Sequence, residues 1–146
     1  MTKLLASYLE TFEVRLKLTE QDVGHLLTPR EGVMHSYVLE STEGDKKKIT
    51  DLVSFYSLPS SILKKDSNYT HVNVAYSYYN VGTVNKIAEL MKFAIVEAKR
   101  LGFDVFNALD IMDNIEFLDE LKFAPGDGSL HYYLFNWSLS SRLTPQ

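Results

Sequence analysis

The chain has 146 residues, enough for one compact domain that buries roughly 70% of the surface its unfolded form exposes. Its net charge of −4 and its scattered basic residues give no electrostatic footprint for a nucleic acid, and its lack of cysteine excludes disulfides and a thiol nucleophile. No apolar run reaches the roughly 18 residues of a membrane span, and the start resembles no secretory signal, so we expect a cytoplasmic protein.

Two helices are predicted at the start of the chain. Residues 2–12 place apolar side chains at i, i+4 and i+8, the spacing of an amphipathic helix. Thr19 is an N-cap followed by acidic residues, and the short second helix that it opens is ended by Pro29.

Three antiparallel strands are predicted next. Residues 35–40 and 49–58 are rich in β-formers and are separated by a polar stretch, which predicts a hairpin with a long loop and with residues 46–48, three lysines, at its solvated tip. Residues 72–79 predict a third strand that carries Val72, Val74, Tyr76 and Tyr78 on one face.

The second half of the chain predicts the longest helix over residues 84–101, with Gly102 as a left-handed C-cap. Residues 103–109 predict a strand buried on both faces. A short helix around Phe117, a turn over residues 125–128 and a last strand over residues 131–137 complete the order. The whole predicts one α+β domain, residues 1–146, with helices laid across a sheet.

Common catalytic and metal-binding patterns are missing from the sequence. The four histidines show neither a paired helical spacing nor adjacent acidic ligands, so no metal site is predicted. There is no Gly-x-Ser-x-Gly nucleophile elbow, and Gly126-x-Gly128 precedes a predicted strand, so it is not a dinucleotide-binding loop.

Several loops and strand ends are instead rich in small polar and aromatic residues. Each one has an ordinary structural explanation. Aromatic side chains on alternating strand positions usually pack in the core, and Asp127 between two glycines is typical of a turn. Asn107 lies inside an apolar strand, where its amide must find partners, most commonly in a neighbouring loop.

Taken together, these segments form an ordered series: SFYSLPS at 54–60, AYSYYNV at 75–81, GFDVFNALD at 102–110, LKF at 121–123, GDG at 126–128 and YYLFN at 132–136. This series resembles the C-terminal half of the eukaryotic N-myristoyltransferases, with plant members the most similar in character. The resemblance covers almost the whole chain.

The resemblance implies the second half of a fold built from two halves like those of GNAT acyl-CoA N-acyltransferases, each a mixed sheet flanked by helices. It also implies that this half lines the groove for a glycine-initiated acceptor peptide. The implied groove residues are Ser60, Tyr76, Asn107, Asp127, Gly128 and Leu130. Ser60 would hydrogen-bond the serine region of the peptide, Tyr76 and Leu130 would form walls, and Asp127 would supply an acidic contact.

Two departures from the family pattern affect the expected activity. The family's acyl-CoA-binding half is absent, and the chain stops where the tail that presents the family's C-terminal carboxylate, the proposed general base, would begin. We therefore assign no catalytic residue and expect this chain alone to be inactive, with myristoyl-CoA the co-substrate of the complete enzyme and no cofactor bound here. The exposed face between the halves is expected to favour self-association.

Three functions remain open at this stage. The first is a part of an N-myristoyltransferase, and the second is an inert half-domain that only binds glycine-initiated peptides. The third is an independent acetyltransferase, which would need a phosphate-binding loop between a strand and a helix. Residues 80–84 offer one glycine and no nearby arginine for that purpose, which disfavours the third function.

Overall fold

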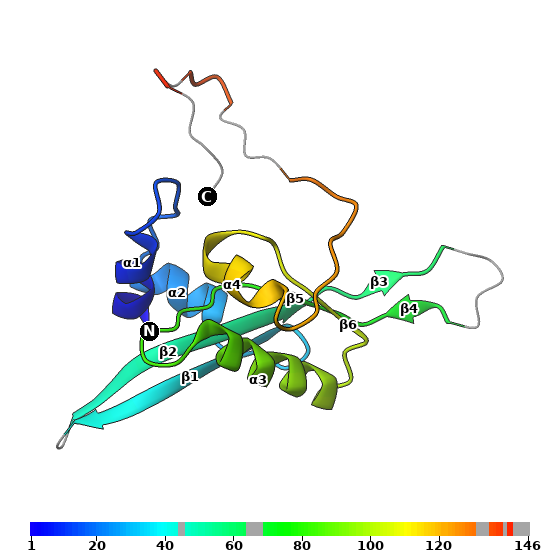
Figure 1. The fold of residues 1–146 in the computed structure, drawn as a ribbon, viewed down its shortest axis with the longest axis horizontal. Helices are drawn as coiled ribbons and strands as arrows, with labels where there is room; N and C mark the ends of the chain where they lie inside the picture. The colour runs from blue at the N-terminus through cyan, green and yellow to red at the C-terminus, as the bar shows by residue number, and fades with distance from the viewer. Residues whose placement is uncertain (44–45, 64–68, 131–134, 139, 142–146) are drawn as a thin grey trace.

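The computed structural model describes residues 1–43, 46–63, 69–130, 135–138, 140 and 141. A four-stranded sheet in the order β1-β2-β5-β6 forms its centre, and a two-stranded arm, β3 with β4, projects from it (Figure 1). The elements, in chain order, are α1 (Thr2–Leu9), α2 (Glu20–Leu27), β1 (Met34–Glu43), β2 (Lys46–Ser57), β3 (Ser60–Ser61), β4 (His71–Val72), β5 (Val74–Ser77), α3 (Ile87–Arg100), β6 (Val105–Asn107), the 3₁₀ turn η1 (Met112–Asn114) and α4 (Ile115–Leu118). The predicted α+β class is confirmed.

The hairpin of β1 and β2 is longer than predicted. The two strands pair from Met34↔Tyr56 to Glu43↔Lys46, so only residues 44 and 45 separate them and the expected long loop is wrong. The lysines at 46–48 accordingly belong to β2 and not to a loop. Polar residues continue the ladder here because both faces of this end meet water, and the Nζ of Lys47 lies 3.5 Å from a carboxylate oxygen of Glu40.

The predicted third strand is interrupted at Asn73. The backbone N–H of Asn73 donates to the Asp104 carboxylate at 2.9 Å, and its carbonyl accepts from the Asp104 amide at 2.9 Å. Because both peptide groups of Asn73 are taken by Asp104, the chain leaves the arm at β4 and joins the main sheet at β5. One predicted strand is therefore two short strands in different sheets.

The long helix α3 begins at Ile87, three residues later than predicted, and ends as predicted before Gly102, whose φ is +86°. It connects β5 to the parallel strand β6. The expectation that this strand is buried on both faces is wrong, because β6 is an edge strand of the described sheet and Val105 is 42% exposed.

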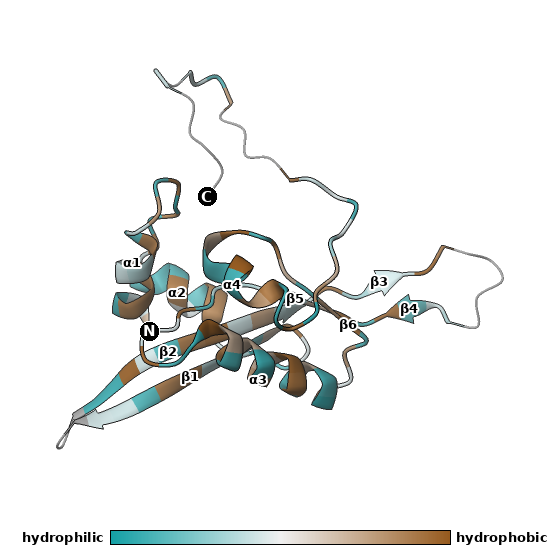
Figure 2. Cartoon of the chain, viewed as in Figure 1, coloured by the Kyte–Doolittle hydropathy of each residue, from teal (hydrophilic) through white to brown (hydrophobic). Residues whose placement is uncertain are grey.

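Each face of the sheet carries one cluster of buried side chains. On one face α3 and α4 pack against β2 and β5, and on the other face α1 and α2 pack against β1 and β2. Brown and teal alternate along α3 in Figure 2, as expected of an amphipathic helix. Among the described residues, no helix is long and apolar enough to cross a membrane.

The capping of α2 and the short helix near the end are confirmed. The Thr19 side chain accepts from the amide of Asp22, and the Asp22 carboxylate accepts from the amide of Thr19, which is a complete capping box. Phe117 is fully buried in α4. Of the predicted last strand, residues 131–134 lie outside the described residues, and Phe135 and Asn136 form a turn instead of a strand.

Candidate functional site

Three tyrosines on neighbouring strands share one face of the sheet, and we call them the tyrosine platform: Tyr56, Tyr76 and Tyr78. Tyr56 and Tyr76 are direct partners in the antiparallel ladder, and their rings stack at 5.5 Å with an interplanar angle of 16°. Tyr78 meets Tyr56 edge to face at 5.7 Å. All three are half-buried, so each presents part of its ring to solvent.

Asn107 extends this platform toward the edge of the sheet. It is the partner of Tyr76 in the parallel pairing of β5 with β6, so both side chains leave the sheet on the same face. Like Tyr76, Asn107 is half-buried. The sheet therefore places an amide, with a donor and an acceptor, directly beside an aromatic wall.

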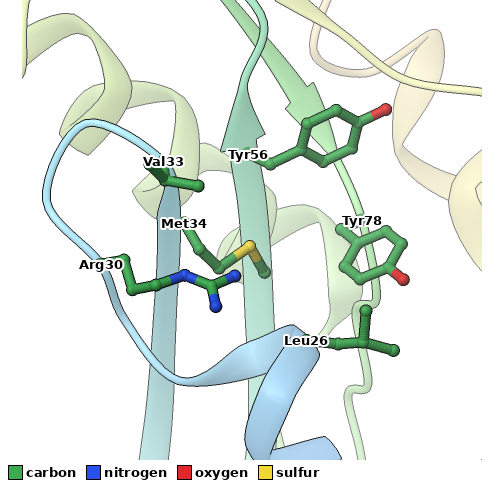
Figure 3. A pocket seen from close by; sticks show the side chains of 6 residues that line it. All are labelled: Leu26, Arg30, Val33, Met34, Tyr56 and Tyr78. Atoms are coloured by element: carbon green, nitrogen blue, oxygen red, sulfur yellow. The ribbon is translucent and has the colours of Figure 1, made fainter. Parts of the chain in front are cut away.

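A small cavity of about 280 Å³ adjoins the other side of the platform (Figure 3). Its lining comes from α2, the turn that follows it, and strands β1 and β2, together with the residue after β5: Leu26, Arg30, Val33, Met34, Tyr56 and Tyr78. Burial and the neighbouring Tyr56 raise the pKa of Tyr78 above its ordinary value.

The structure brings together two of the residues predicted from the sequence, Tyr76 and Asn107. Ser60 lies on β3 in the arm, where it pairs with Val72 and is exposed. Asp127, Gly128 and Leu130 lie in an exposed stretch after α4 that runs outward from the body (Figure 1). Within the described residues, no hydrogen bond or ring contact joins Ser60 or Asp127 to Tyr76, and the roles of these four residues stay predictions.

Sequence reasoning missed Tyr56, Tyr78 and Arg30 as site residues. The two tyrosines had a detectable signal, because Tyr78 alternates with Tyr76 and the SFY segment contains Tyr56. Arg30 had none, since an arginine in a polar turn is ordinary and its neighbours in space come from other elements.

The loop before α3 forms a nest of backbone amides that the protein fills with its own carboxylate. One oxygen of Asp51 accepts from the amides of Thr83, Val84 and Asn85 at 2.7, 3.0 and 3.3 Å. The other accepts from the Asn85 side chain at 2.9 Å and from the Thr50 hydroxyl at 2.9 Å. A helix start of this kind commonly binds phosphate, but here Asp51 already occupies the donors.

The Asp51 carboxyl is held ionised in this nest. Burial alone would favour the protonated form, but the hydrogen bonds from Val84, Asn85 and Thr83 outweigh it and hold the pKa of Asp51 below its usual value. The same hydrogen bonds fix the loop of Thr83, Val84 and Asn85, and the chain turns into α3 only after it, at Ile87 and not at Val84.

The carboxyl ends of the parallel strands β5 and β6 are also filled from within. In parallel sheets, ligands often bind in the crevice beyond these ends. Here the Asn80 side chain donates to Ser77 at 2.7 Å and to Asn114 at 3.4 Å, and Asn114 donates to the carbonyl of Leu109 at 2.8 Å. These buried amides satisfy one another in the place where a bound ligand would lie.

The chemistry available at the platform is recognition. Among the described residues there is no group of three or more acidic or histidine side chains that could hold a metal ion. The platform offers stacking surface from three rings and an amide that can hydrogen-bond an extended backbone.

Comparison with known proteins identifies the family. The family model described as the C-terminal domain of myristoyl-CoA:protein N-myristoyltransferase matches residues 1–146. Glycylpeptide N-tetradecanoyltransferase 1 of Arabidopsis thaliana is 53% identical over 145 residues, which are 99% of this chain and 33% of that protein. The Plasmodium falciparum enzyme of the same name is 43% identical over 141 residues, 97% of this chain and 33% of its own length. The chain thus spans about a third of these relatives.

Solved structures agree with the fold. Saccharomyces cerevisiae N-myristoyltransferase with bound myristoyl-CoA matches with a TM-score of 0.75 and 34% identity, over 86% of this chain and 33% of that one. A ribosomal-protein-alanine N-acetyltransferase from Brucella melitensis matches with a TM-score of 0.56 and 19% identity, over 92% and 88%, which confirms the GNAT-like fold alone. By its sequence and by its fold, this chain belongs to the N-myristoyltransferase family and corresponds to that family's C-terminal domain.

Proposed function

We propose that this chain is the part of an N-myristoyltransferase that binds the glycine-initiated end of an acceptor protein. Myristate would pass from myristoyl-CoA to the glycine amine, as the names of the relatives describe for those proteins. The chain's share of the reaction is to hold the acceptor in an extended conformation, because the tyrosine platform and Asn107 offer binding surface on one face of the sheet.

The observation that carries this proposal is the pairing of Tyr76 with Asn107 on one face of the sheet. An extended peptide needs hydrogen bonds to its backbone and surface for alternate side chains, and an amide beside an aromatic wall supplies both. Ser60, Asp127, Gly128 and Leu130 would complete the groove when the acceptor and the rest of the enzyme are in place.

The acyl-CoA is proposed to bind outside this chain. Its pyrophosphate requires a set of free donors, and the one nest at a helix start that the described chain builds is taken by Asp51. The crevice beyond β5 and β6 is occupied by Asn80 and Asn114. The same contacts disfavour an independent acetyltransferase.

A chimera tests the proposal. The matched segment of the Arabidopsis relative is replaced by this chain, and myristate transfer to a Gly-Ala-Ala-Ala-Ser peptide is measured at saturating myristoyl-CoA. We expect activity, with the peptide KM raised about 3- to 10-fold by Asn107→Ala, the size of one lost hydrogen bond. Gln21→Ala, which removes an exposed amide from α2, should leave KM unchanged. An inactive chimera that is folded and binds myristoyl-CoA would refute the proposal.

The alternative is an inert peptide-binding module. It is favoured by one observation: the platform and Asn107 are complete within this chain and need no residue from elsewhere. A chimera that binds the peptide and does not transfer myristate would support this alternative.

We also propose that one exposed apolar face promotes self-association. It consists of Leu39 on β1 and Phe93 on α3, which are 45% and 46% exposed. Leu39 and Phe93 line a cavity of about 540 Å³ between the hairpin and α3. Covering these side chains with a second copy would remove apolar surface from water.

A further inference from the structure

The cavity beside the tyrosine platform contains one charged residue, Arg30. Of the six lining residues the others are apolar or aromatic: Leu26, Val33, Met34, Tyr56 and Tyr78. Figure 3 shows the Arg30 side chain reaching across Met34 toward the space between Leu26 and the two tyrosines. A cation therefore points into a wall of rings and alkyl groups.

The turn that carries Arg30 is fixed by the backbone. Arg30 and Met34 exchange two hydrogen bonds of 2.9 Å, and the Val33 carbonyl accepts from the Ser57 amide at 2.9 Å, which ties the turn to β2. Gly32, with φ of +68°, supplies the left-handed residue that this turn requires. Arg30 is thus presented by a preorganised segment, so binding need not order the turn.

The guanidinium of Arg30 is available for a ligand. The two ion pairs among the described residues join Lys47 to Glu40 and Arg100 to Glu97, and no hydrogen bond in that part of the chain reaches the Arg30 side chain. A guanidinium presents a planar set of donors that matches a carboxylate.

The size of the cavity limits its occupant. Sites for small molecules and cofactors usually have about 300–1,000 Å³, and this one has about 280 Å³. It is therefore suited to one amino-acid side chain. A glutamate fits its chemistry, because the two methylene groups can lie against Met34 and the rings while the carboxylate meets Arg30.

The cavity is continuous with the proposed peptide site. Tyr56 lines the cavity and stacks on Tyr76, which pairs with Asn107. Tyr76 and Tyr78 are two positions apart in an extended segment, and a strand rises about 3.3 Å per residue, so the two positions lie roughly 7 Å apart along the platform. An extended peptide covers about the same length per residue, so the two places lie roughly two peptide residues apart.

We propose that the cavity formed by Arg30, Met34, Tyr56 and Tyr78 is a specificity subsite for one acidic side chain of the acceptor peptide. The acidic residue lies about two positions from the peptide residue that contacts Tyr76 and Asn107. This inference rests on the proposed function, because it assumes that the acceptor binds along the platform.

The test is a peptide titration of the ¹⁵N-labelled chain followed by NMR. The peptides have eight residues and start Gly-Ala-Ala-Ala-Ser. Each peptide carries one glutamate, or one glutamine as its neutral counterpart, at a single position other than the first glycine and the serine. The set covers all of those positions. At one position we expect glutamate to bind about 3- to 5-fold more tightly than glutamine, the size of an exposed ion pair, with shifts at the Val33 and Met34 amides. The preference should fall as salt is added.

Variants assign the preference to Arg30. Arg30→Gln should abolish it, and Arg30→Glu should replace it with a preference for lysine at the same position. Arg15→Gln is the matched control, since it also removes one exposed cation but lies between α1 and α2, and it should keep the preference.

The outcomes separate the two proposals. If the peptides shift the Tyr76 and Asn107 signals but glutamate and glutamine bind equally at every position, the acidic subsite is refuted and the peptide-binding function stands. A preference that persists in Arg30→Gln also refutes the subsite. If no peptide shifts the Tyr76 and Asn107 signals, the peptide-binding function fails, and the subsite fails with it.

Discussion

Asp51 and His35 illustrate how differently this fold treats its titratable side chains. Asp51 is fully buried and accepts hydrogen bonds from Thr50, Thr83, Val84 and Asn85. The Nε2 atom of His35 is buried without a hydrogen-bond partner among the described residues, and its ring stacks on Phe55 at 4.9 Å. Each side chain makes stability depend on pH, in a different range.

Replacing Asp51 by alanine should destabilise the protein by about 2–4 kcal/mol, because the part-buried amides before α3 lose their acceptor and the buried site loses its side chain. Since the folded-state pKa of Asp51 is lowered, its contribution is present above the unfolded value of about 4 and is lost as the pH falls through the folded value. Urea unfolding at pH 7 and pH 3 measures both effects. Asp110→Ala, at an exposed carboxylate, is the control, and a loss below about 0.5 kcal/mol in Asp51→Ala would contradict the nest.

Stability should also fall as the pH drops below about 6.5, because burial lowers the pKa of His35 in the folded protein. In this pH range His35 is protonated in the unfolded chain before it is protonated in the folded chain, which favours unfolding. His35→Phe should remove this dependence and raise stability by about 1 kcal/mol at pH 7, since it deletes a buried nitrogen without a partner. Thermal unfolding between pH 5 and 7.5 measures this pH dependence and the change in stability. His71→Gln, at an exposed histidine, should retain the wild-type profile.

At the scale of elements, replacement of glycine by alanine should change the stability of the protein in opposite directions at Gly24 and Gly82. Gly24 lies inside α2, where a Cβ would have nothing within 4 Å of it, so Gly24→Ala should stabilise the protein by about 0.5–1 kcal/mol. A Cβ on Gly82 would lie 2.6 Å from the Asn85 carbonyl oxygen, so Gly82→Ala should displace the loop before α3 and destabilise by about 1–3 kcal/mol. Urea unfolding of the two variants measures both stability changes. If both substitutions stabilised the protein, or both destabilised it, the loop geometry would be contradicted.

Local patterns predicted most elements but not where they begin and end. The capping box at Thr19, the apolar spacing of α3 and its end at Gly102 depend on neighbours in the sequence, and these predictions were confirmed. The start of α3 and the break at Asn73 were missed because Asp51 and Asp104 act from 32 and 31 positions away. A prediction made from neighbouring residues in the sequence does not take such distant partners into account.

The site was predictable to a similar degree. The resemblance picked out Tyr76 and Asn107, and strand pairing then places them side by side. Arg30 could not be found, because its importance comes from the meeting of a turn with two strands. Alternation identifies which residues share a face, whereas a cavity depends on how separate elements pack.

For the whole molecule, the apolar face of Leu39 and Phe93 predicts self-association that grows with concentration. The face adjoins β1, one of the two edge strands of the described sheet, whose free edge adds unpaired backbone groups. Leu39→Lys with Phe93→Lys should shift the chain toward the monomer in sedimentation velocity experiments. Leu16→Lys, at a residue 62% exposed between α1 and α2, is the control. A wild-type chain that stays monomeric at about 1 mM would contradict the prediction.

The strand order β1-β2-β5-β6 also has a consequence for the path of folding. The hairpin can close from Glu43↔Lys46 outward, one pair at a time, so its first contacts cost little loop entropy. β6 reaches β5 only after the chain has crossed α3, since Val74 pairs with Val105. We therefore expect the hairpin to form early and β6 to dock late. In the native protein, amide protons of β6 should exchange with solvent through openings that leave the centre of β2 protected.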